Sequence, residues 1–385
     1  MKKIAILGAS EPHLPLFLKA KEMGLETYCF AWNQGAYCKD YADHYYDISI
    51  TDKEQIAQVC QKEQINGIIS NALEIAVPTV AYVSNLLGLN GIPYNVALDA
   101  RNKFQMREKV AHQQACQQPN YTLYQSGNMP SSYPVIVKPV DGSCSNGVTK
   151  VSRKEDFAQA LDRALQASCN NCILIEEYIE GREVSVESIS FHGKHYVITI
   201  TDKETTGAPY FVETAHHQPS NLPFDIQEKL KCAVKSMLDA IGINNGASHA
   251  EFKIDQNGNI FFIEVGARGG GDFISYDLVK LSTGYDYVRG MIEVALNEFN
   301  IPKHAFQKCS GVYFLSKEVS YIRTFIENNK NAEWAVRYHI DEGPLHELKK
   351  SQDRSGYIIY QTDHRISISA VSYTHLRAHE TDQYL

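Results

Sequence analysis

Residues 248–272, SHAEFKIDQNGNIFFIEVGARGGGD, decide how the rest of the chain is organised. Two apolar-rich runs, 249–255 and 260–265, flank the dipeptide Asn257-Gly258. This dipeptide favours the positive φ angles of a tight hairpin turn. The stretch therefore predicts a β-hairpin whose loop consists of these two residues.

The predicted register places two carboxylates side by side. With a two-residue loop, Glu251 faces Glu264, and their Cβ atoms lie roughly 4.5–5.5 Å apart. The opposite face then carries four apolar side chains, Phe252, Ile254, Phe261 and Ile263. Directly opposed like charges are destabilising, and Mg²⁺ beside substrate phosphates is a common partner of paired carboxylates. A solvated sheet face that tolerates an acidic pair is the alternative.

Arg268 and three glycines, 269–271, follow the hairpin at once. Glycine lets the backbone approach a ligand closely. Two carboxylates, an arginine and a glycine run together indicate chemistry on anionic oxygen and phosphoryl groups.

The whole-chain composition narrows the class of protein. The 385 residues are enough for two or three domains, and 44% hydrophobic with 21% charged residues is ordinary for a globular protein. A net charge of −8 argues against nucleic acid as the main partner. We expect no membrane partner either, because no apolar run approaches membrane-spanning length. The nine cysteines are scattered, which is typical of reduced thiols in a cytoplasmic protein.

Strands alternate with helices over residues 1–98. The runs KKIAIL, LETYCFAW and INGIISN read as buried strands, and amphipathic segments separate them. This alternation predicts a doubly wound α/β domain with a parallel sheet. Only Gly8 stands where a G-x-G-x-x-G fingerprint is needed, which argues against a nicotinamide site.

A second part begins near residue 99 with a helical segment that carries Lys103. The strand YPVIVKP follows a turn-rich connector and ends with Lys138. The loop directly after it, DGSCSNG, contains Ser143 and Ser145 and offers backbone N–H groups and hydroxyls to phosphates. An ordinary loop beside a strand-end lysine is the alternative.

Two further segments carry candidate polar residues. One is acidic and contains Glu176, Glu177, Glu180, Glu183 and Glu187, some of which fit a solvated edge. The other is a turn-rich segment that contains Glu213, His216 and His217, the last expected to be structural or exposed.

An α+β segment over 301–371 completes the fold. Residues 372–385 resemble translated vector sequence and are left out of the fold argument as a non-native tail.

The order of these parts resembles the ATP-grasp superfamily of carboxylate–amine ligases over residues 1 to about 300. The resemblance rests on Lys103, VIVKP with Lys138, the glycine/serine loop, EEYIEGREVSVE and the hairpin. It implies an α/β and α+β chain, with an N-terminal pre-ATP-grasp domain (1–98) and a two-lobed ATP-grasp domain (99–300, small lobe about 116–178). Within the superfamily, ETAH, with Glu213 and His216, resembles the L-amino acid ligases that form dipeptides.

The resemblance also implies roles for individual residues. Glu213 receives the amino group of the first substrate, and His216 and Arg268 stabilise charge during transfer. Glu251 and Glu264 bind Mg²⁺, or Mn²⁺ in its place. The ATP-binding residues are Lys103 and Lys138 at the phosphates, Ser143 and Ser145 in the loop, Glu176, Glu177 and Ile179 at the adenine, and Glu183 at the ribose.

One position departs from the superfamily pattern. Many members carry Asn two residues after the second glutamate as an additional metal ligand, and here that residue is Gly266.

The function implied by the resemblance is that of an ATP-dependent ligase, which joins a small-molecule carboxylate to an amine through an acylphosphate. A carboxylate ligase of purine or cofactor metabolism and a non-catalytic ATP-binding regulatory module remain alternatives. Homodimers are common among such enzymes.

Overall fold

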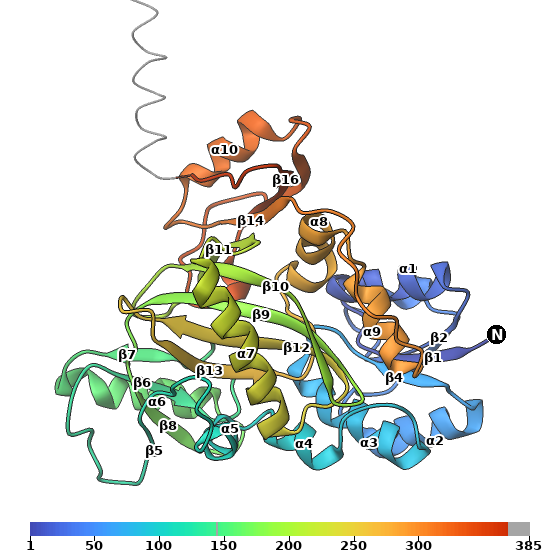
Figure 1. Ribbon diagram of the computed structural model, residues 1–385, viewed down its shortest axis with the longest axis horizontal. Helices are drawn as coiled ribbons and strands as arrows, with labels where there is room; N and C mark the ends of the chain where they lie inside the picture. The colour runs from blue at the N-terminus through green and yellow to red at the C-terminus, as the bar shows by residue number, and fades with distance from the viewer. Residues whose placement is uncertain (144, 369–385) are drawn as a thin grey trace, which may run out of the picture.

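The computed structural model describes residues 1–143 and 145–368 (Figure 1). It contains a four-stranded parallel sheet, a four-stranded antiparallel sheet and an eight-stranded antiparallel sheet. The predicted α/β and α+β architecture is therefore confirmed. Within these described residues, every helix is too short or too polar to cross a membrane. The segment 372–385, interpreted above as a non-native tail, lies outside them.

The N-terminal parallel sheet has the strand order β3-β2-β1-β4. Its strands are β1 (Lys3–Leu7), β2 (Glu26–Ala31), β3 (His44–Asp47) and β4 (Gly67–Ile69). Its helices are α1 (Leu14–Glu22), α2 (Lys53–Glu63) and α3 (Val77–Leu87). Alternate residues of β1 face opposite sides, so Ile4 and Ile6 pack with α1, whereas Ala5 and Leu7 pack with α2 and α3.

The small lobe consists of one sheet and one helix. Its strand order is β5-β8-β6-β7. The strands are β5 (Tyr121–Leu123), β6 (Val135–Pro139), β7 (Thr149–Val151) and β8 (Ile173–Glu177). Helix α6 (Phe157–Ala167) covers one face through Phe157 and Ala160, which pack against Val135, Val137 and Ile173. Side chains on the other face are free to line a cavity.

The large sheet has the order β13-β12-β9-β10-β11-β14-β16-β15. The first five strands are β9 (Arg182–Phe191), β10 (Lys194–Thr205), β11 (Glu213–Gln218), β12 (Gly246–Ile254) and β13 (Ile260–Gly266). The C-terminal segment adds β14 (Cys309–Leu315), β15 (Ala335–Ile340) and β16 (Gly356–Thr362). Because β14 pairs directly with β11, the C-terminal segment continues the same sheet (Figure 1).

The remaining helices join and cover these sheets. Residues of α7 (Phe224–Ile241) pack against the large sheet, and α9 (Tyr287–Ala295) packs against α1 of the N-terminal domain. The shorter helices are α4 (Tyr94–Asp99), α5 (Lys103–Val110), α8 (Val279–Thr283) and α10 (Tyr321–Asn329). The contact between α9 and α1 ties the N-terminal domain to the later part of the chain.

The hairpin of β12 and β13 confirms the central pairing but not the predicted turn. Glu251 pairs with Glu264, as the sequence predicted. The loop, however, is closed by Asp255, whose N–H donates to Asn259 O at 3.0 Å. The Asp255 carboxylate also accepts the backbone N–H groups of Asn257 and Asn259, which stabilises the longer loop.

A β-bulge restores the pairing of the two glutamates. The register shifts by one residue between Glu251 and Phe252, so Phe252 faces Phe262 rather than the position that a two-residue loop requires. The predicted apolar face was therefore wrong in part, because Ile260 and Phe262 are buried in place of Phe261 and Ile263. Ile263 lines a cavity together with Glu264.

Candidate active site

Two adjoining cavities lie where the small lobe, the hairpin and the N-terminal domain meet. The first is lined by Lys138, Tyr178 and Phe211, and the second by Glu213, His216 and Arg268. Both are lined by Lys103, Gly142, Ser143, Ser145, Glu183, Glu251 and Glu264. The structure thus brings every site residue named from the sequence to one continuous space, although those residues come from distant parts of the chain.

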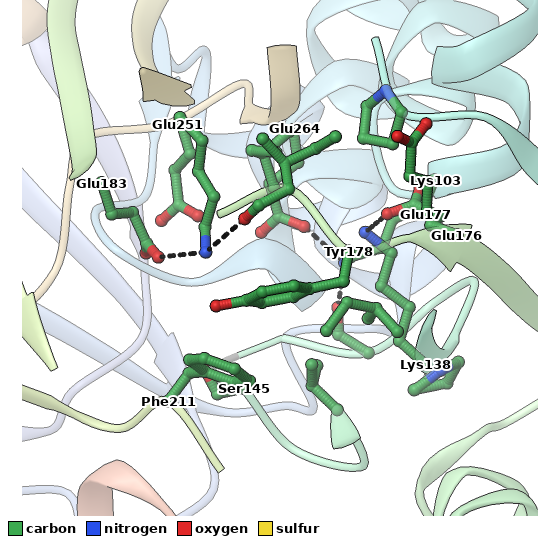
Figure 2. A pocket seen from close by; sticks show the side chains of 18 of the residues that line it. Lys103, Lys138, Ser145, Glu176, Glu177, Tyr178, Glu183, Phe211, Glu251 and Glu264 are labelled. Atoms are coloured by element: carbon green, nitrogen blue, oxygen red, sulfur yellow. Dashed lines mark hydrogen bonds and ion pairs between the residues drawn. The ribbon is translucent and has the colours of Figure 1, made fainter. Parts of the chain in front are cut away.

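Three carboxylates lie along one wall of this space. Figure 2 shows Glu183, Glu251 and Glu264, which belong to the neighbouring strands β9, β12 and β13. Lys203 on β10, which was not identified from the sequence, is the counter-ion of Glu183 and Glu251 in this wall and also of Glu213. Its ammonium lies 2.6 Å from Glu251 Oε1, 3.4 Å from Glu183 Oε1 and 3.3 Å from Glu213 Oε1. Burial lowers the pKa of Lys203, but these carboxylates outweigh it and hold the pKa well above its usual value.

A buried histidine supports Glu251 from behind. His249 Nδ1 lies 2.8 Å from Glu187 Oε1, and its Nε2 lies 3.2 Å from Glu251 Oε1. Burial alone would lower the pKa of His249, but the two glutamates raise it to about 9. Although burial disfavours the charged carboxylate of Glu251, Lys203 and His249 hold its pKa well below the usual range. Glu251 is therefore ionised at neutral pH.

Lys103 links the hairpin to the glycine/serine loop. It begins α5, whose N-terminus is capped by the Asn102 side chain. Its ammonium lies 3.0 Å from Glu264 Oε2 and donates to Gly142 O at 2.6 Å. A single cation therefore reaches both the candidate phosphate loop and one of the two candidate metal ligands.

The side chain of Glu176 has a different environment from the one expected at an adenine. It is buried between Arg107 Nε at 2.8 Å and Lys138 Nζ at 2.6 Å. Figure 2 shows Glu176 and Lys138. Arg107 is fully buried and was missed from the sequence; it also donates to Ile263 O at 2.7 Å. The carboxylate of Glu176 therefore holds Lys138 in place, and the backbone of the strand is left to face a ligand.

Aromatic side chains form another wall of the first cavity. The rings of Tyr178 and Phe211 lie with centroids 6.0 Å apart, and both line the cavity (Figure 2). The ammonium of Lys150 lies 3.6 Å from the centroid of Tyr178. A planar base can pack against such rings. Tyr178 carried no recognisable signal in the sequence beyond its place next to the acidic strand.

The N-terminal domain contributes one carboxylate to the second cavity. Glu74 follows β4, and its Oε1 lies 2.8 Å from Arg268 Nε. A β-carbon at position 266 would overlap Glu74 Oε1. Gly266, where many ATP-grasp proteins carry Asn, is thus the residue that lets Glu74 reach Arg268.

The two adjacent histidines have different surroundings. His216 lines the second cavity, and its Nε2 lies 3.6 Å from Asp272 Oδ2. Burial lowers the pKa of His216 and outweighs the opposing effect of Asp272. His217 is also buried, with Nδ1 2.9 Å from the Tyr360 hydroxyl, which agrees with the structural alternative given above and not with exposure.

The two hairpin carboxylates fit a magnesium ion that is shared with phosphates. Within residues 1–143 and 145–368, no cluster of three or more His, Cys, Asp or Glu side chains is arranged to hold a metal. Mg²⁺ is usually bound by one or two carboxylates together with substrate phosphates and water. Glu251 and Glu264 face each other at the cavity shared with Lys103, and they meet this requirement.

The chain is similar to known proteins in sequence and in fold. A family model described as an ATP-grasp domain matches residues 131–277. An alanine–anticapsin ligase from Bacillus subtilis is 25% identical over 317 residues, which cover 75% of this chain and 66% of that protein. The chain thus matches 66% of the length of that curated relative.

Solved structures share the fold over almost the whole chain. The L-amino acid ligase from Bacillus licheniformis has a TM-score of 0.77 with 22% identity, covering 99% of this chain and 97% of its own. Phosphoribosylglycinamide synthetase from Anaerococcus prevotii has a TM-score of 0.73 with 20% identity, covering 99% and 98%.

Residues 131–277 therefore match an ATP-grasp domain, and the chain shares its fold with the L-amino acid ligase and with the phosphoribosylglycinamide synthetase. One of the curated relatives is named as an alanine–anticapsin ligase, and one of the solved neighbours is named as an L-amino acid ligase.

Proposed function

We propose that this chain is an ATP-dependent ligase that activates an amino acid carboxylate as an acylphosphate and joins it to the amino group of a second amino acid. The observation that carries the proposal is the position of Glu251 and Glu264. They lie where a cavity with aromatic walls meets a cavity that holds Glu213, His216 and Arg268. A nucleotide and an amino acid can therefore meet at one pair of carboxylates.

The first cavity is the proposed ATP site. Lys103 and Lys138 supply cations for the phosphates, and Ser143 and Ser145 lie in the loop beside them. Glu183, which lines the same cavity, would accept ribose hydroxyls. The backbone near Glu177 and Ile179, together with the aromatic wall described above, would bind the adenine.

Glu251 and Glu264 would hold Mg²⁺ against the phosphates, where the ion supplies charge neutralisation for phosphoryl transfer. Lys203 would serve the same electrostatic purpose from the protein side, because it is fixed among three carboxylates and lines the second cavity. Phosphoryl transfer depends mainly on such positioning and charge neutralisation.

The chemistry answers a simple problem. A carboxylate repels nucleophiles and has no good leaving group, and transfer of the ATP γ-phosphoryl group to one of its oxygens corrects both faults. The amine nitrogen then forms the C–N bond, the C–O bond to phosphate breaks, and a proton leaves the nitrogen. ADP, phosphate and an amide are the products.

Residues of the second cavity would have different roles in these reaction steps. Glu213 would receive the ammonium group of the first substrate. Arg268 and His216 would form the oxyanion hole, because both can donate hydrogen bonds to the negative charge that develops on the carbonyl oxygen. The low pKa of His216 favours a neutral imidazole, which can donate one N–H to that oxygen.

The test is phosphate release from Mg-ATP across a panel of single L-amino acids and pairs. Release that requires a particular pair, with a condensed product of the expected mass, supports the proposal and names both substrates. If no amino acid releases phosphate although ATP binds, the proposal fails. The next acceptors to assay would then be amines of purine metabolism, because phosphoribosylglycinamide synthetase shares the fold.

A further inference from the structure

Arg354 of the C-terminal segment reaches the residue proposed to receive the substrate ammonium. It lies between a short 3₁₀ turn (Ser351–Asp353) and β16. Its Nη2 donates to the backbone oxygen of Glu213 at 3.0 Å and lies 3.2 Å from Glu213 Oε2. Its Nη1 lies 2.8 Å from Asp272 Oδ1. One guanidinium therefore bridges two carboxylates of the second cavity.

The route of this side chain fixes its guanidinium tightly. In the large sheet β14 separates β16 from β11, so Arg354 must cross β14 to reach Glu213. It crosses over Phe314, with its guanidinium carbon 3.7 Å from the ring centroid. Only 9% of the side chain is exposed. A planar cation that stacks on a ring and forks to two carboxylates cannot be replaced by lysine without loss of geometry.

Glu213 is held from two sides as a result. Lys203 approaches Oε1 at 3.3 Å, and Arg354 approaches Oε2 at 3.2 Å. Ser351, which also lines the second cavity, donates to Oε2 at 3.4 Å. The plane of the carboxylate is therefore set before any substrate enters.

Asp272 receives the second arm of the guanidinium. This residue has a left-handed backbone conformation with a φ of 51°, and it lines the second cavity beside His216. Its carboxylate contacts Arg354 through Oδ1 and His216 through Oδ2. Arg354 thus connects the proposed ammonium acceptor with the proposed oxyanion donor.

We propose that Arg354 is a positioning residue of the amino acid site, which orients Glu213 for the substrate ammonium and Asp272 for His216. The inference rests on the proposed function, and it makes the C-terminal segment part of the substrate site. Arg354 acts through Glu213 and Asp272, and ATP lies in the other cavity. Its loss should therefore weaken amino acid use and leave ATP use unchanged.

The kinetic test compares Arg354→Lys and Arg354→Ala with a matched control, Arg337→Ala. Arg337 belongs to the same segment and also pairs with an aspartate, Asp277, and packs over an aromatic ring, but it does not line either cavity. We expect the KM for the amino acid whose ammonium binds Glu213 to rise about 10- to 100-fold in both Arg354 variants. The KM for ATP should stay within about twofold, and the control should match the wild type. An unchanged amino acid KM, or an equal rise in both KM values, overturns the proposal.

A second measurement does not depend on turnover. A crystal structure of Arg354→Ala should show the Glu213 carboxylate turned away from its present plane, while Lys203 still pairs with Glu251. An unmoved Glu213 overturns the positioning role whatever the kinetics show. Failure of the wild-type chain to use any amino acid would reject the proposed function, whereas this structure would still decide whether Arg354 orients Glu213. If Arg354→Ala does not fold, Arg354→Lys serves both measurements.

Discussion

Glu74 Oε1 lies 2.8 Å from Arg268 Nε, so the N-terminal domain holds the arginine that we assign to the transfer step. The approach depends on Gly266, where any β-carbon would meet the Glu74 carboxylate. The N-terminal domain therefore contributes directly to the geometry of the second cavity.

Gly266→Ala should lower turnover by displacing Glu74 from Arg268. We expect a fall in kcat/KM of about 10- to 100-fold, which corresponds to the loss of roughly one charged hydrogen bond. Steady-state kinetics would measure it, and thermal melting would confirm that the fold is kept. The double variant Gly266→Ala/Glu74→Gln should be no worse than the more impaired single variant, because both changes remove the same contact. Fully additive losses would contradict this link.

Arg268→Ala should abolish ligation with little effect on folding. Removal of one oxyanion donor typically costs on the order of a hundred- to a thousand-fold in rate. The matched control is Arg289→Ala, an exposed arginine on α9 that pairs with Glu293 and lines neither cavity. Rates of product formation for the two variants test the assignment, and near-normal turnover in Arg268→Ala would reject it.

Lys203→Met should destabilise the protein in the absence of ligands. The ammonium is nearly fully buried among Glu183, Glu213 and Glu251, so its removal leaves three carboxylates without their shared cation. Breaking a buried pair in this way costs about 3–5 kcal/mol. Urea unfolding would measure the loss, and millimolar Mg²⁺ should recover part of it by binding the folded state.

The control for this experiment is Lys229→Met, which removes an exposed helical lysine that pairs with Asp225. Exposed pairs contribute at most about 1 kcal/mol. Equal unfolding free energies for Lys203→Met and the control would show that the three carboxylates do not need Lys203.

Stability should fall in mild acid because of His13. The residue is 2% exposed, and burial lowers the pKa of its imidazole from about 6.5 to about 4. The unfolded chain therefore binds a proton between pH 6.5 and pH 4 that the folded chain resists. The unfolding free energy is therefore unaffected by the protonation of His13 above pH 6.5. It falls by roughly 3 kcal/mol as the pH decreases from 6.5 towards 4.

Urea unfolding at pH 7 and pH 4.5, followed by tryptophan fluorescence, would measure this effect. His13→Gln should remove most of the difference in unfolding free energy between pH 7 and pH 4.5, although it also lowers stability at pH 7. An unchanged pH dependence in the variant would show that other groups cause the acid sensitivity.

The pairing of Glu251 with Glu264 could be predicted because it is local. Both residues lie in one hairpin, and the alternation of side chains along each strand places them on the same face. The turn itself was predicted wrongly, since the Asp255 side chain stabilises a longer loop than Asn257-Gly258 alone requires. The bulge that compensates for it has no signal in the sequence.

Residues that meet across long separations could not be found in this way. Lys203 and Arg107 stand in strand and helix segments where a single cation looks ordinary, and only the fold surrounds them with carboxylates. Arg354 is 141 residues from Glu213 in the chain. Glu176 was identified from the sequence, but its position in the acidic strand does not reveal that its carboxylate already pairs with Lys138.

The central claim is that ATP phosphorylates the substrate carboxylate, and oxygen transfer tests it most directly. The amino acid that supplies the carboxylate would carry ¹⁸O in both carboxyl oxygens, and the released phosphate would be analysed by mass spectrometry. The account predicts one ¹⁸O atom in each phosphate, because the C–O bond of the acylphosphate breaks when the amine attacks. Phosphate without ¹⁸O during normal product formation would contradict the account.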